Sequence, residues 1–187
     1  QYKKNTERII KVYLINFIFM FSSYFKLKKD KDKYEYKAQD IYKRILSLSG
    51  NFTNLENYFK KKDFNTTFEV FSIFIIFYIK NLKDLKLKNY QNINQKLIDL
   101  FIKDLDYSLR EQGIGDMKIG KYVKKYVKKF YYRLSIIDKN LNNSNSNELS
   151  LFLKNLDFIN NDHLEEVLKK IYSKYNEIKS ELKNEFI

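Results

Sequence analysis

The chain contains no proline and only four glycines among its 187 residues. Few positions can therefore form the tight turns that an all-β protein requires. Apolar residues instead recur at the i, i+3, i+4 and i+7 spacing of amphipathic helices, and no stretch sustains the alternation typical of a strand. The sequence thus predicts an all-α fold, an irregular bundle of about six or seven helices.

Capping boxes mark two of the helix starts. In such a box the side chain of a Ser or Thr accepts a hydrogen bond from the backbone amide three residues later. The Glu side chain at that later position accepts one from the backbone amide of the Ser or Thr. Thr53 with Glu56 and Thr66 with Glu69 have this spacing. The helices that we expect span residues 34–48, 55–61, 68–85, 93–111, 117–140, 148–156 and 164–186.

Two glycines separate the fourth and fifth of these helices. We expect Gly113 or Gly115 to adopt a positive φ, because glycine alone does so without steric cost. Asp116 follows them and is placed to cap the next helix.

Several classes of site are excluded by composition. The absence of cysteine excludes disulfides, thiolate metal sites and cysteine nucleophiles, and His163 is the only histidine. Asp104 and Asp106 are two residues apart, so they point away from each other on a helix and cannot chelate one ion together. We therefore predict no catalytic residue, no metal site and no cofactor.

Three parts are expected along the chain. Residues 1–33 form an apolar helix and a basic linker, residues 34–156 a helical domain, and residues 157–187 a C-terminal helix. The apolar stretch at residues 9–25 is slightly shorter than the about 20 residues of a membrane span. It suits a helix that packs on the body or lies on a membrane surface.

The helix predicted from residue 68 is the most apolar in the chain, with apolar side chains on nearly every side up to residue 79. Such a helix is typical of the centre of a core. The alternative is that one face stays open for an apolar client. The candidate lining of that groove is Phe71, Phe74, Phe77 and Tyr78.

The helix at 117–140 divides into an apolar half and a lysine-rich half. With a net charge of +13, its basic half suits RNA phosphates, anionic lipid headgroups or an acidic partner. A solvated face enriched in lysine by composition is equally open. The candidate contact residues are Lys121, Lys125, Lys128, Tyr132 and Arg133.

One block is more specific. Residues 104–116 read Asp-Leu-Asp-Tyr-Ser-Leu-Arg-Glu-Gln-Gly-Ile-Gly-Asp, and the basic helix that follows contains Phe-Tyr-Tyr-Arg at 130–133. This resembles the ubiquinol–cytochrome c chaperone family, in which a Leu-Arg-Glu-x-Gly-Val-Gly-Asp block precedes a basic helix ending in Phe-Tyr-Gly-Arg. Residues 38–42 and 63–77 resemble its opening Leu-Tyr helix and its Phe-Glu hydrophobic helix. The motif residues are Asp104, Asp106, Leu109, Arg110, Glu111, Gly113, Gly115 and Asp116.

The resemblance implies a non-enzymatic assembly chaperone of the respiratory ubiquinol–cytochrome c reductase. Its implied partners are newly made cytochrome b, a small helical co-chaperone, the ribosome and a membrane surface. The type is alphaproteobacterial or mitochondrial, which implies the mitochondrial matrix beside the inner membrane, or the bacterial cytoplasm. Met20 resembles the start of family members, so residues 1–19 are expected to be an extension or an upstream-start artefact. The basic face leaves a second function open, a structural or RNA-binding component of a mitochondrial ribosome.

Overall fold

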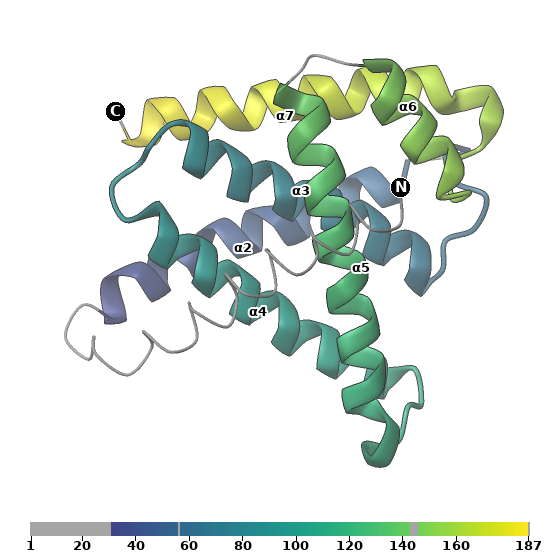
Figure 1. The fold of residues 1–187 in the computed structure, drawn as a ribbon, viewed down its shortest axis with the longest axis horizontal. Coiled ribbons are helices and arrows are strands. Elements are labelled where there is room, and N and C mark those ends of the chain that lie inside the picture. The colour runs from purple at the N-terminus through teal and green to yellow at the C-terminus, as the bar shows by residue number, and fades with distance from the viewer. Residues whose placement is uncertain (1–30, 56, 143–145, 187) are drawn as a thin grey trace, which may run out of the picture.

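The computed structural model describes residues 31–55, 57–142 and 146–186 (Figure 1). Within these residues the fold is built from helices, with one isolated β-bridge, so the predicted all-α bundle is confirmed. No helix in the described ranges is both long and apolar enough to cross a membrane, and the apolar stretch 9–25 lies outside them. The elements are α2 (Lys31–Thr53), α3 (Phe64–Asp84), α4 (Tyr90–Glu111), α5 (Asp116–Asn142), α6 (Ser146–Asn155), the 3-10 turn η2 (Asn161–His163) and α7 (Leu164–Phe186).

Helix α3 lies at the centre of the bundle, as its uniform apolarity predicts. It packs against α2, α4, α5 and α7, and Ile75, Ile76 and Phe77 on it are completely buried. Each such side chain stabilises the fold by roughly 1.5–3 kcal/mol relative to an exposed one. The single core cluster draws on every α-helix of the described chain.

The start of α3 differs from the predicted capping box. Asp63, not Thr66, is the N-cap, and its carboxylate accepts a hydrogen bond from the Thr66 backbone amide at 2.9 Å. This bond holds the pKa of Asp63 below its usual value. Glu69 is buried on α3 and takes no part in the cap.

The predicted helix at 55–61 is also wrong. Thr53 does not open a new helix, because it is the last residue of α2 and its hydroxyl donates to the Ser49 carbonyl at 2.8 Å. Residues 58–60 run beside residues 158–160, so two loops distant in sequence lie together.

Backbone and ring contacts hold these two loops. Lys60 N donates to the Phe158 carbonyl at 3.0 Å, and Asn160 N donates to the Tyr58 carbonyl at 2.9 Å. The buried rings of Phe59 and Phe158 stack with centroids 5.9 Å apart. We call residues 58–60 and 158–160 the clasp. Long-range pairing of this kind keeps residues 57–61 out of a helix.

Helix α7 shares the core with the rest of the bundle. Its bounds match the predicted 164–186, and it lies along one edge of the molecule (Figure 1). Tyr175 packs its ring edge-on against Phe77 of α3 with centroids 5.3 Å apart, and Ile171, Ile178 and Leu182 are buried. Residues 157–186 are therefore part of the same packed unit as the described residues between 34 and 156.

Candidate functional site

The α4–α5 hairpin projects from one end of the body, with its turn at the tip (Figure 1). The turn is a Schellman motif. Ile114 N donates to the Leu109 carbonyl at 3.2 Å and Gly113 N to the Arg110 carbonyl at 2.8 Å. Gly113 has φ +82°, which confirms the predicted positive φ at this residue. Leu109 is buried and anchors the end of α4 in the core.

Helix α5 begins one residue earlier than the sequence predicts. The Gly115 carbonyl accepts from the amides of Lys118 and Ile119 at 2.9 and 3.1 Å, so Gly115 rather than Asp116 occupies the capping position. Asp116 is the first helical residue. Its carboxylate lies at the N-terminus of the helix, where the dipole favours a negative charge.

Arg110 ties the two helices together across the turn. Its Nε donates to the Asp106 carboxylate at 2.6 Å, one turn back on α4, while another guanidinium nitrogen pairs with Asp116 on α5. The bonds to Asp106 and then Asp116 raise the pKa of Arg110. All three side chains are exposed, so solvent screens each pair, and their combined effect is to fix the orientation of the tip.

Asp104 contacts Tyr42 of α2, whereas Asp106 contacts Arg110. Burial raises the pKa of the Tyr42 hydroxyl on α2, and the nearby Asp104 carboxylate raises it further through charge and a hydrogen bond. Asp104 therefore joins α4 to α2, whereas Glu111 is exposed beside the turn.

The outer face of α5 carries exposed lysines. Between Asp116 and Asp138 the helix contains no acidic residue, and the exposed lysines form no ion pair with any described residue. Lys129 differs from them because it is partly buried, lies 5.1 Å from the Tyr126 ring centroid, and has a pKa lowered mainly by burial. The exposed set is Lys118, Lys121, Lys124, Lys125 and Lys128, with Tyr132 37% exposed beyond it.

Arg133 is wrongly assigned to this basic face. It is 6% exposed and points into the core, where its guanidinium makes a two-pronged ion pair with Glu69 of α3, also 6% exposed. Residue 133 lies one helical turn past the partly buried Lys129 and therefore falls on the side of α5 that faces α3. Sequence reasoning missed this pair because its members are 64 residues apart.

The predicted client groove on α3 is not open. Phe71 is 9% exposed, Phe74 and Tyr78 are 1% exposed, and Phe77 is completely buried. Their rings are covered by other helices: Tyr42 of α2 and Phe101 of α4 pack on Phe71. These side chains form the core and cannot contact a client while α3 stays packed.

The described ranges hold no metal-binding arrangement, since no group of three or more Asp, Glu, His or Cys side chains there converges on a point. His163 lies in the η2 turn, with Nδ1 3.7 Å from the Glu166 carboxylate. Its ring packs against Tyr58 at 5.5 Å between centroids, and the Tyr58 hydroxyl donates to Glu166. This cluster reinforces the clasp at the start of α7.

The model of the ubiquinol–cytochrome C chaperone family matches residues 60–179, which is more than half of the chain. The chain belongs to this family. The match starts later than the resemblance in the sequence and runs through most of α7, in agreement with the shared core. The crystal structure of the Cbp3 homolog from Brucella abortus is similar, with a TM-score of 0.59 and 24% identity, covering 76% of this chain and 83% of that chain. That likeness supports the fold. No curated protein matches.

Two of the sequence blocks that carry the family resemblance contact each other in the structure. The Phe-Glu block of α3 and the Phe-Tyr-Tyr-Arg block of α5 meet, because Glu69 pairs with Arg133 while Phe101 packs between Phe68 and Phe130. The Arg110 contacts belong to the other motif block. The contacts of Glu69 with Arg133 and of Arg110 with Asp116 thus tie α5 to α3 and to α4.

Proposed function

We propose that this protein is an assembly chaperone of the ubiquinol–cytochrome c reductase and that its client is newly made cytochrome b. The observation that carries the proposal is the family match over residues 60–179. Membership in a chaperone family implies a role in binding rather than catalysis. The mitochondrial matrix, or the cytoplasm of an alphaproteobacterium, is where such a client is made.

The folded bundle limits how a client is held. Because the α3 aromatic side chains are buried, a membrane helix must meet the chaperone at its surface. In the part of the chain that the structure describes, the large apolar side chains exposed there are spread over α2, α4, α5 and α6: Tyr36, Leu46, Tyr107, Met117, Tyr132 and Leu151. A membrane helix presents about 20 apolar residues, which these dispersed side chains cannot cover alone. We therefore propose that a small helical co-chaperone completes the binding surface.

Removal of the protein from its native cells tests this function. We expect loss of assembled ubiquinol–cytochrome c reductase on native gels and rapid turnover of cytochrome b, while cytochrome oxidase assembles normally. Re-expression of the wild-type chain restores the reductase. Normal reductase levels in cells that lack the protein would contradict the proposal.

A further inference from the structure

Four lysines and a tyrosine form a straight row on α5. Lys118, Lys121, Lys125, Lys128 and Tyr132 follow one another at i, i+3, i+7, i+10 and i+14, which places them on one face of a helix. At 1.5 Å per residue the row is about 21 Å long. All five side chains are exposed. We call these residues the lysine row.

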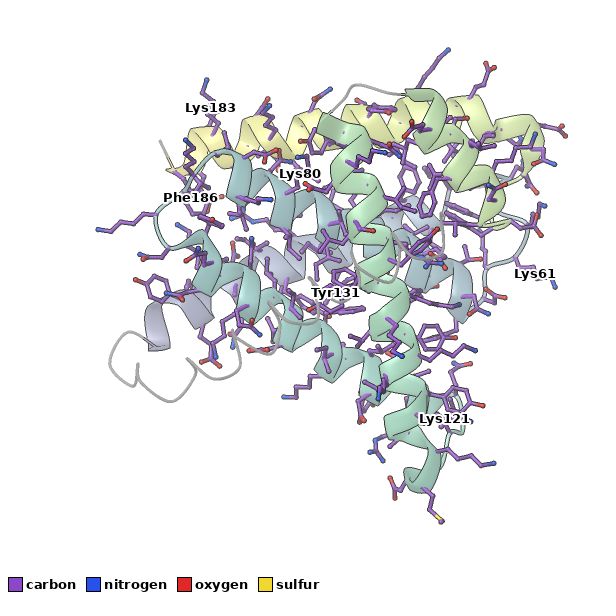
Figure 2. All side chains as sticks on the ribbon, viewed as in Figure 1. Lys61, Lys80, Lys121, Tyr131, Lys183 and Phe186 are labelled. Carbon is purple, nitrogen blue, oxygen red and sulfur yellow. The ribbon has the colours of Figure 1, made fainter. Side chains whose placement is uncertain are left out.

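The charge of the lysine row is not neutralised within the described chain. None of its lysines has an ion-pair partner there, and α5 carries no acid from residue 117 to 137. Of the acidic groups near the tip, Asp106 and Asp116 are both held by Arg110, and Glu111, exposed at the end of α4, forms no ion pair with a lysine of the row. The row therefore presents uncompensated positive charge on the projecting hairpin, and Lys121 lies close to its tip (Figure 2).

An apolar side chain stands beside this charge. Met117, in the first turn of α5 next to Lys118, is 101% exposed, the largest exposed fraction among the large hydrophobic side chains that the structure describes. A thioether neither stacks well on a base nor donates a hydrogen bond to a phosphate. It does gain free energy on entering the boundary between lipid headgroups and acyl chains, where lysines can remain in the headgroup layer.

We propose that the α4–α5 hairpin docks on a membrane surface that carries anionic lipid headgroups. The lysine row lies along the headgroups and Met117 enters the layer beneath them. The Schellman turn and Arg110 orient the tip for this contact. The inference goes beyond the proposed function, because it assigns a surface that does not depend on which client the chaperone holds.

Vesicle binding by the full chain tests the proposal. Vesicles of phosphatidylcholine mixed with cardiolipin are compared with vesicles of phosphatidylcholine alone, and partitioning is measured by co-sedimentation. Each basic side chain near an anionic surface contributes roughly fivefold to partitioning, so the triple variant K121Q/K125Q/K128Q is expected to lose about a hundredfold. Gln preserves helix propensity, and a thermal melt checks that the variant folds.

A matched control removes the same charge elsewhere. Lys169, Lys179 and Lys183 are exposed on α7, and Lys183 lies at the opposite end of the molecule from Lys121 (Figure 2). The variant K169Q/K179Q/K183Q is expected to bind within about threefold of wild type, because charges beyond a Debye length are screened. Met117→Ser is expected to weaken vesicle binding severalfold.

Three outcomes would overturn the proposal. Equal losses in the two triple variants would mean that only net charge matters. Binding that survives K121Q/K125Q/K128Q would place the membrane contact elsewhere in the chain. Salt-sensitive binding of structured RNA that depends on the lysine row but is insensitive to Met117→Ser, with no vesicle binding, would show that the row contacts nucleic acid.

Discussion

The buried ion pair between α3 and α5 makes a strong prediction about stability. Glu69 and Arg133 are each 6% exposed, and the guanidinium also donates to the Lys129 carbonyl at 3.1 Å and lies 6.0 Å from the Phe68 ring centroid. Arg133→Met keeps most of the side-chain volume but leaves the Glu69 carboxylate buried without a partner. Removing one member of a buried pair typically costs about 3–5 kcal/mol.

Chemical and thermal denaturation followed by circular dichroism measure this cost. For a chain of this size, about 3–5 kcal/mol corresponds to a fall of roughly 6–20 °C in Tm. The double variant E69L/R133M removes both charges, so we expect it to recover much of the loss. The exposed pair between Lys60 and Asp157 is the control, and Asp157→Asn is expected to cost less than about 1 kcal/mol. Arg133→Met that unfolds within about 0.5 kcal/mol of wild type would refute the reasoning.

Three further predictions concern the turn, the α3 cap and the clasp. Gly113→Val is expected to lower the free energy of unfolding by about 1–2 kcal/mol, and Gly115→Val by less, because only Gly113 has positive φ. Asp63→Ala is expected to cost about 0.5–2 kcal/mol at neutral pH. The pKa of Asp63 is lower in the folded than in the unfolded state. The stability difference between wild type and Asp63→Ala is therefore present above pH about 4 and disappears as the pH falls through the folded-state pKa. Urea titrations at several pH values measure this dependence. Phe158→Ala removes the buried ring that stacks on Phe59 in the clasp. This change is expected to lower the free energy of unfolding by about 3–5 kcal/mol in the same denaturation assay. A loss below about 1 kcal/mol would mean that the clasp contributes little.

Periodicity in the sequence is sufficient to predict the long helices. Helix α7 has the predicted bounds because its stripe of apolar residues is uninterrupted, and α3 is central because almost no side of it is polar. The lysine-rich half of α5 is exposed for the same reason. These features are local, so a single chain reveals them.

Contacts between distant segments account for the errors. Thr53 with Glu56 has the spacing of a helix start, yet residues 58–60 pair with a loop about 100 positions away, and that pairing overrides the local signal. Glu69 has the spacing of a capping box, but its carboxylate accepts hydrogen bonds from Arg133 on another helix. No local pattern distinguishes a cap from a buried pair, or a core aromatic such as Phe74 from one that lines a groove.

The resemblance in the sequence singles out a block of residues without showing what they do. Arg110, Gly113 and Asp116 belong to a specific block, and only the structure shows that they shape and brace a turn. The same holds for Glu69 and Arg133. A client groove on α3 followed from hydrophobicity alone, and hydrophobicity alone does not separate a binding surface from a core.

Capture of cytochrome b during its synthesis is the most direct test of the chaperone role. Proteins made in the native cells are pulse-labelled, crosslinked briefly and recovered through a tag on this protein. We expect labelled cytochrome b in the eluate soon after the pulse and its loss during the chase as the reductase assembles. Efficient synthesis of labelled cytochrome b with none recovered at any time would contradict the assignment of this client.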